Sequence, residues 1–249
     1  MQKKGAVHRP FFVAQAMTAG PFIFGFYSLA HAAFALAALS LLPFVPWAVL
    51  ALFVVESITA YDNLIIVLGR RIGVGAVAQR LNRQRFFLHA VCIGLLVPVY
   101  VSIGAALDGA GMNSQGFAAA GWLAAALIGG VGFSLQYRKL RRIMPINYYG
   151  CLRYAQSVHA SRRYPGYEYS DSELAQKPAP PLASIVTVFI GLVISCWVGW
   201  STGFWLPFAA TAFMLSAAAL PAETWGPLLT SAIEVLFSAA LVYSLAVVI

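Results

Sequence analysis

The sequence predicts an all-α membrane protein, a bundle of about seven transmembrane helices with its N-terminus in the cytosol and its C-terminus outside. Hydrophobic residues make up 61% of the 249 residues, and charged residues only 10%. A soluble domain carries roughly 25% charged residues, so this composition is not suited to a surface in water. The mean hydropathy of +0.79 agrees with that interpretation. The length suits a single helical bundle without a second globular domain.

Apolar runs of about 20 residues indicate helices that cross a bilayer. Seven such runs cover residues 22–42, 46–68, 86–107, 117–136, 182–202, 204–220 and 227–249. The sixth run is short and follows the fifth almost at once, so a re-entrant pair of half-helices is the alternative. The chain then divides into an N-terminal cytosolic or interfacial segment and two groups of helices around one loop, at 1–21, 22–136, 137–181 and 182–249.

The positive charges predict the orientation. All 16 Lys and Arg residues lie before the first run, after the second or after the fourth. Cytosolic loops retain Lys and Arg, so these three segments are expected in the cytosol, next to anionic lipids. We expect a bacterial-type inner (plasma) membrane. The net charge of +8 is confined to these segments, which favours membrane topology over a nucleic-acid partner.

The loop at 137–181 is the only long polar stretch, and it holds seven of the eleven tyrosines. Tyrosine and arginine together suit the headgroup zone of a membrane. The segment 150–163 is compatible with an amphipathic helix lying on the membrane surface.

Ionisable side chains at membrane depth are costly, and each is a candidate for function. The second run contains Glu56, Thr59, Asp62 and Asn63. At 100° per residue, Glu56, Thr59 and Asn63 fall within about 60° of one another, and Asp62 lies about 120° from Glu56. Such a polar wedge must face the bundle interior or a water-filled cavity.

The seventh run carries a matching polar stripe, because Thr230, Glu234 and Ser238 recur every four residues. Glu234 lies about 10 Å from the expected cytosolic end, at 1.5 Å per residue. We expect Asp62, Asn63, His89 and Glu234 to line a cavity open to the cytosol, with Glu56 deeper. Several buried carboxylates cannot all stay ionised, so they would share protons or hold a cation. The alternative is that these groups only bridge helices.

Two further features suggest specific contacts: a histidine in the first run and the arginines of the basic loops. His31, in the first run, is expected to form a hydrogen bond to a neighbouring helix. Arginine binds phosphate through a planar fork, so the basic loops predict contacts to a phosphate group or an anionic headgroup. The same arginines also serve as a topology signal. The candidates are Arg70, Arg71, Arg83, Arg85, Arg141 and Arg142.

The sequence does not predict a metal site or a cofactor. Its three cysteines have no paired spacing, and it lacks a His-Glu-x-x-His motif. None of the apolar runs contains a lysine that could hold a retinal. The paired Asp-rich motifs of membrane prenyltransferases are also missing.

Three function classes stay open. The first is transport or binding of a small solute, proton or cation through the intramembrane carboxylates. The second is a membrane-embedded enzyme acting on a lipid or isoprenoid phosphate at the cytosolic face. The third is a non-catalytic scaffold or assembly protein. We find no internal repeat, so any symmetry would have to come from a homo-oligomer.

Overall fold

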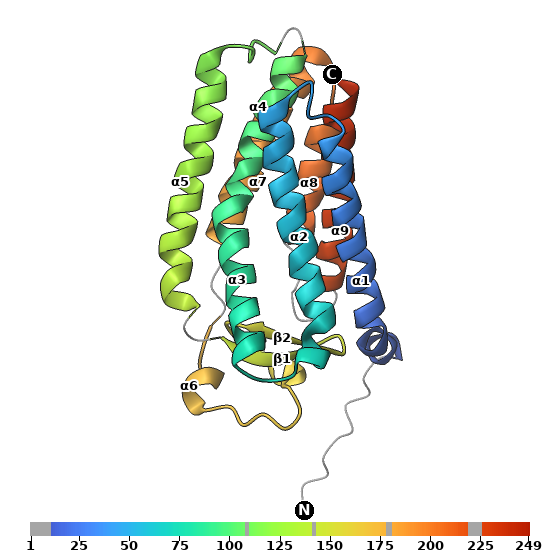
Figure 1. Ribbon diagram of the computed structural model, residues 1–249, viewed down its shortest axis with the longest axis vertical. Helices are drawn as coiled ribbons and strands as arrows, with labels where there is room; N and C mark the ends of the chain where they lie inside the picture. The colour runs from blue at the N-terminus through green and yellow to red at the C-terminus, as the bar shows by residue number, and fades with distance from the viewer. Residues whose placement is uncertain (1–10, 108–109, 141–142, 178–180, 219–225) are drawn as a thin grey trace, which may run out of the picture.

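The computed structural model describes residues 11–107, 110–140, 143–177, 181–218 and 226–249. Most of this part of the chain forms long helices that run side by side (Figure 1). Six helical segments in it are long and apolar enough to cross a membrane, which supports an integral, multi-pass membrane protein. They are Ala19–Leu39, Pro46–Ile72, Ala76–Ala106, Gln115–Tyr137, Leu182–Thr202 and Leu228–Val247.

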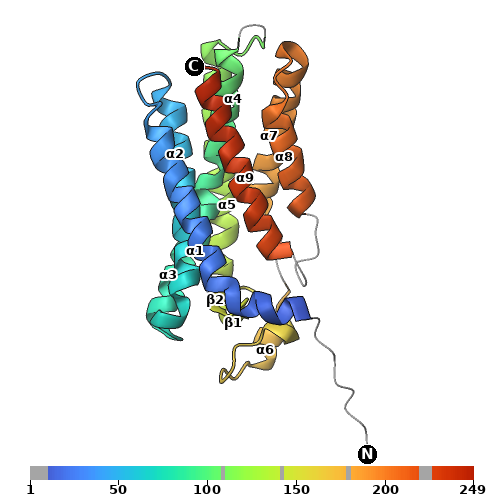
Figure 2. The same cartoon turned by 90° about the vertical axis from the view of Figure 1, so that its right-hand side faces the viewer.

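The first two helices form an antiparallel pair. Helix α1 (Phe11–Leu39) contains Pro21, and its first part runs across the bundle before the helix turns along it (Figure 2). Proline removes a backbone donor and bends a helix, which accounts for the turn. Helix α2 (Pro46–Ile72) begins with a proline and ends at Gly73. The hydroxyl of Ser28 in α1 donates to the carbonyl of Ala60 in α2, at 2.9 Å.

The third crossing is interrupted near its middle. Helix α3 (Ala76–Cys92) passes through a short 3-10 turn, η1 (Ile93–Leu95), into α4 (Leu96–Ala106). Pro98 has no N–H to donate to the carbonyl four residues earlier, so the regular ladder cannot continue there. Helix α5 (Gln115–Lys139) packs against α3. A Cβ atom at Gly132 would overlap the carbonyl oxygen of Ala90, so these two helices approach closely through small residues.

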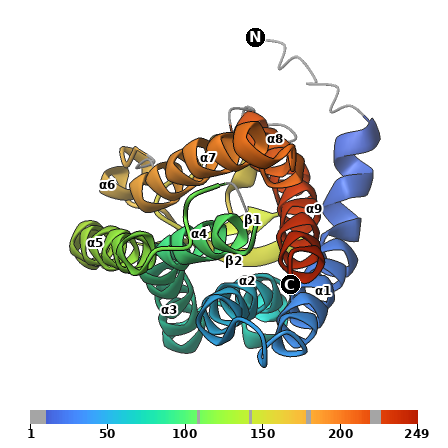
Figure 3. The same ribbon diagram turned by 90° about the horizontal axis from the view of Figure 1, so that it is seen from above.

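The last three helices are α7 (Leu182–Thr202), α8 (Leu206–Ala218) and α9 (Gly226–Val247). Helix α8 has 13 residues, about 20 Å at helical rise, which is shorter than a hydrocarbon core of about 30 Å. Among the described residues, six segments are long enough to cross a membrane, one fewer than the seven expected. Helices α1, α2, α4, α7, α8 and α9 pack one against the next and close a ring, with α5 outside it (Figure 3).

One end of the bundle carries a β-hairpin that the sequence analysis did not predict. Strands β1 (Met144–Tyr148) and β2 (Cys151–Ala155) pair antiparallel, with Tyr148 opposite Cys151. The turn residues Tyr149 and Gly150 both have positive φ, at 50° and 83°, as a type I′ turn requires. The expected surface helix at 150–163 is therefore replaced by β2 and the short 3-10 turn η2 (Ala160–Arg162). A single helical turn, α6 (Asp171–Leu174), follows.

The hairpin packs directly on the bundle. We call this end, formed by β1, β2 and the turn between α2 and α3, the hairpin end. A Cβ atom at Gly69 in α2 would overlap the carbonyl oxygen of Leu152, and one at Gly20 in α1 would overlap that of Tyr149. Arg70 and Arg71 at the end of α2 and Arg153 in β2 lie at this end.

Candidate functional site

Four acidic or histidine side chains of α1, α2 and α9 lie, along the sequence, between two apolar clusters. The far cluster includes Ala38 of α1, Val55 of α2 and Phe237 of α9, together with residues of α4. The hairpin cluster includes Phe24 of α1, Ile66 of α2, Leu228 of α9 and parts of both strands. Along α1 and α9 these are His31 and Glu234, and along α2 they are Glu56, next to the far cluster, and Asp62, closer to the hairpin cluster. We call His31, Glu56 and Glu234 the polar layer.

The centre of the polar layer is a buried pair. Nδ1 of His31 and Oε2 of Glu56 are 2.7 Å apart. The exposed fractions of the two residues are 0% and 1%. Nε2 of His31 has no hydrogen-bond partner among the residues that the structure describes. Imidazole and carboxyl groups at this distance can share one proton, and separated charges would be costly in such surroundings.

Glu234 of α9 belongs to the same electrostatic cluster. Its carboxyl interacts with the charges of His31, His89, Asp62 and Glu56, and His31 is the strongest of these. The side chain is half-buried. Helices two and seven of the sequence analysis therefore both contribute carboxyl groups to this region. The direct partner of Glu56, however, is His31 of α1.

Two further polar residues of α2, Thr59 and Asn63, form hydrogen bonds within their own helix. Thr59 and Asn63 are buried, as the expected wedge requires. The Thr59 hydroxyl donates to the Val55 carbonyl at 3.0 Å, and Nδ2 of Asn63 donates to the Thr59 carbonyl at 3.0 Å.

His89 of α3 lies beside a small pocket. Its Nε2 is 3.3 Å from the hydroxyl of Ser184 in α7. The pocket is a shallow depression between α2 and the α3–η1 segment, with no room for a water molecule. The lining residues are Val55, Ile58, Thr59, His89, Cys92 and Ile93.

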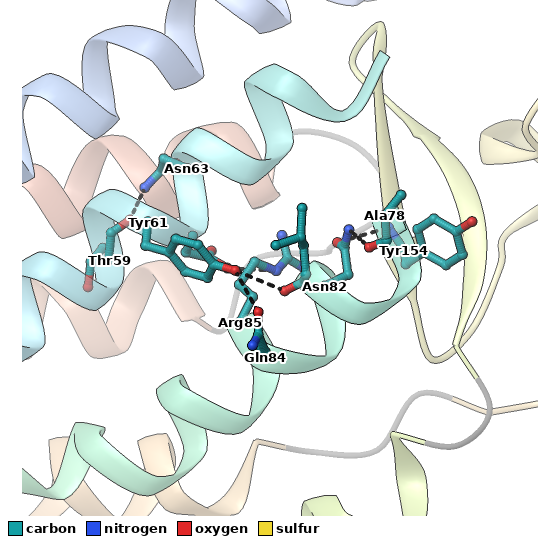
Figure 4. Close-up of polar contacts among 10 residues, drawn as sticks. Thr59, Tyr61, Asn63, Ala78, Asn82, Gln84, Arg85 and Tyr154 are labelled. Atoms are coloured by element: carbon teal, nitrogen blue, oxygen red, sulfur yellow. Dashed lines mark hydrogen bonds and ion pairs between the residues drawn. The ribbon is translucent and has the colours of Figure 1, made fainter. Parts of the chain in front are cut away.

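Asp62 forms a second ion pair closer to the hairpin end. Nε of Arg85 lies 2.8 Å from Oδ1 of Asp62. Arg85 is fully buried, whereas the Asp62 side chain is 28% exposed. Figure 4 shows Arg85 next to Tyr61, where α2 and α3 meet. The sequence analysis assigned Arg85 to phosphate contact and did not foresee its pairing with Asp62.

The other predicted phosphate contacts are spread out. Arg70 and Arg71 are exposed at the end of α2, and Arg83 is half-buried on α3. Arg141 and Arg142 lie outside the described residues.

The His, Asp and Glu side chains of this region can exchange protons and carry charge. Within the described ranges, no group of three or more His, Cys, Asp and Glu side chains is placed to hold a metal ion. The hydrogen bond expected from His31 to a neighbouring helix is present, but its partner, Glu56, was not predicted. A signal was available, because His31 and Glu56 lie almost equally far from Pro43 along the sequence, and a short connection makes α1 and α2 antiparallel neighbours.

No protein-family model, no curated protein and no solved structure matches this chain. The site must therefore be interpreted from its own geometry, as part of an integral membrane protein with six apolar helices.

Proposed function

We propose that this protein carries or binds a small solute in the membrane, and that a proton or cation on the polar layer is linked to that process. The observation that carries the proposal is the His31–Glu56 pair, fully buried between two apolar clusters. A pair that only joined α1 to α2 would not need ionisable groups, because a neutral hydrogen bond serves that role.

The polar layer supports proton linkage in a specific way. Nε2 of His31 is unpaired within the described part of the chain, and the His31 charge acts on Glu234. A proton shared by Glu56 and His31 can therefore pass to a group near Glu234, or a monovalent cation can replace it. Opening the hairpin cluster would expose the layer at one face, and opening the far cluster would expose it at the other. We infer that the hairpin end faces the cytosol.

Enzyme and scaffold remain the competing classes. An enzyme acting on a lipid or isoprenoid phosphate would use Asp62 beside Arg85 at the hairpin end. In a scaffold, the same groups would only join helices. The three classes differ in what neutralising Glu56 does, because only transport places that residue in the path of the carried ion.

The test is a flux assay on protein reconstituted into vesicles loaded with a pH-sensitive dye. Gradients of Na⁺, K⁺ and methylammonium are imposed in turn. We expect a change of internal pH with the wild type that Glu56→Gln and His31→Gln abolish. Glu168→Gln is the matched control, because Glu168 is an exposed glutamate outside the bundle. Size-exclusion profiles and circular dichroism check that each variant is folded.

Two results would reject the proposal. One is the absence of a protein-dependent pH change under all of these gradients. The other is equal flux in Glu56→Gln, His31→Gln and the control, with folding intact.

A further inference from the structure

The end of the bundle away from the hairpin carries large exposed aromatic side chains. Trp47 lies at the start of α2, Trp200 lies near the end of α7 and Trp205 lies directly before α8, and these helix ends lie at the same end of the bundle (Figure 1). Tyr243 lies close to the end of α9, which reaches the same end. The exposed fractions of Trp47 and Trp200 are 69% and 83%, and the other two residues are also exposed. We call these four residues the aromatic girdle.

The chemistry of the exposed surface changes from the girdle toward the hairpin. Closer to the hairpin, the exposed side chains of the same helices include Leu50 of α2, Phe189 of α7 and Leu236 of α9, which carry no polar group. Indole and phenol rings combine an apolar face with a hydrogen-bonding group, so they favour the boundary between lipid headgroups and acyl chains. The girdle therefore has the chemistry of side chains at a bilayer boundary.

The bend of α1 marks a second level, near the hairpin. Before Pro21 the helix runs across the bundle, and after it the helix runs along the bundle (Figure 2). The part from Pro21 to Leu39, the last residue of α1, is about 27 Å long at helical rise. A hydrocarbon core is about 30 Å thick. The bend and the opposite end of α1 are therefore separated by about one hydrocarbon thickness.

The polar layer lies midway between these two levels. Glu56 follows Trp47 by nine residues in α2, and this is about 14 Å at helical rise. Glu234 precedes Tyr243 by nine residues in α9, which gives the same spacing. His31 follows the bend of α1 by ten residues, or about 15 Å. Half of a hydrocarbon core is also about 15 Å, so three helices give the same depth.

We infer that the aromatic girdle contacts lipid at the headgroup boundary of the leaflet away from the hairpin, and that the polar layer lies near the middle of the bilayer. The girdle is spread over helices on different sides of the ring (Figure 3), which suits a surrounding lipid boundary better than a single protein partner. An ion on the polar layer is then separated from either surface by about half of the hydrocarbon core. The inference rests on the membrane crossing of the helices and does not require proton linkage.

Depth measurements with nitroxide labels test the position of the polar layer. Leu29→Cys and Leu236→Cys place labels at exposed positions two residues from His31 and Glu234. Trp200→Cys places a label in the girdle, and Leu182→Cys, at the exposed start of α7, is the control for the opposite boundary. The native cysteines are replaced by alanine, and the protein is reconstituted in phosphatidylcholine. Collisions with oxygen, which concentrates in the bilayer centre, are compared with collisions with a water-soluble nickel chelate.

We expect the labels at positions 29 and 236 to lie near the bilayer centre. The label at position 200 should lie about 14 Å closer to the headgroups than they do, and the label at position 182 should lie near the other boundary. The inference is overturned if the labels at 29 and 236 are no deeper than those at 200 and 182. Neither outcome depends on proton flux, so this test is independent of the proposed function.

Tryptophan fluorescence tests the lipid contact of the girdle and retains the native cysteines. Variants that keep only Trp200 or only Trp122 are reconstituted with phosphatidylcholine brominated either near the headgroup or near the chain end. Trp122 is the matched control, because it is an exposed tryptophan two turns into α5. We expect bromine near the headgroup to quench Trp200 more strongly, and bromine near the chain end to quench Trp122 more strongly. Quenching of Trp200 by aqueous iodide alone contradicts a lipid contact, and quenching by neither reagent indicates that a protein covers it, which also overturns the inference.

Discussion

Asn82 of α3 connects the helical bundle to the β-hairpin through the backbone of Tyr154. Its Oδ1 accepts the Tyr154 N–H at 3.2 Å, and its Nδ2 donates to the Ala78 carbonyl at 2.8 Å (Figure 4). The Tyr154 hydroxyl in turn accepts the N–H of Gly75, at 3.0 Å. These bonds fix β2 against α3 and hold the hairpin beside Arg85.

Asn82→Ala should loosen the hairpin. The substitution leaves the Tyr154 N–H without its acceptor in a buried place, which costs about 1–3 kcal/mol. We expect faster hydrogen exchange across residues 144–155, with little change in α7 and α9. Gln79→Ala, a half-buried glutamine on the same helix, serves as the control. Unchanged exchange in the hairpin of Asn82→Ala would show that other contacts hold it.

Tyr100 and Thr211 form a buried connection between α4 and α8, with their hydroxyl oxygens 2.6 Å apart. Double-mutant cycles inside membrane proteins give about 0.6 kcal/mol for such bonds, with a maximum near 1.7 kcal/mol. A cycle of Tyr100→Phe with Thr211→Val should give a coupling free energy of unfolding in that range. Tyr243→Phe, at an exposed tyrosine of α9, should change the free energy of unfolding much less. A coupling of zero would mean that the two hydroxyl groups are independently solvated.

Cys151 in β2 should resist alkylation in the folded protein. Burial raises the pKa of its thiol to about 11, against a smaller opposing effect of the Arg70 charge. At pH 8, only about one thousandth of this thiol is then ionised, and the thiolate is the reactive form. In a chain with Cys92→Ala and Cys196→Ala, iodoacetamide should react slowly until the protein is unfolded in detergent. Rapid labelling of the folded protein at pH 8 would contradict the burial of this strand.

The raised pKa of the Cys151 thiol also predicts how the stability of the hairpin depends on pH. Its pKa is higher in the folded state than the value of about 8.5 for an unfolded chain. The contribution of the neutral thiol to stability is therefore complete below about pH 8.5 and is lost as the pH rises toward about 11. Cys151→Ala should remove this alkaline loss, measured by hydrogen exchange of the hairpin.

The sequence predicted the helical crossings well where apolar length decides the structure. The expected run 182–202 has the same limits as α7, and the polar wedge of α2 places Glu56, Thr59 and Asn63 in the interior. The sixth run was ambiguous because its composition is apolar while the described part of its helix has only 13 residues. Whether a segment can cross a membrane depends on its length and its hydropathy, and both can be obtained from a single sequence.

The hairpin and the pairings were harder to predict, because they depend on contacts between distant segments. Tyrosine and arginine in residues 150–163 suggested a surface helix, whereas the turn at Tyr149 and Gly150 and the alternating apolar residues before and after it indicate strands. His31 and Glu56, like Asp62 and Arg85, are joined across short helix connections. Their pairing follows from the register of neighbouring helices, which periodicity within a single helix does not give.

The central claim is that His31 shares a proton with Glu56 and responds to Glu234. The most direct measurement is nitrogen NMR of the His31 ring, in protein labelled with ¹⁵N-histidine and reconstituted in lipid, followed as a function of pH. We expect Glu56→Gln and Glu234→Gln each to change the pH dependence of the His31 signals, and Glu168→Gln to leave it unchanged. His31 signals that stay the same in the Glu56 and Glu234 variants would contradict the polar layer as a coupled site.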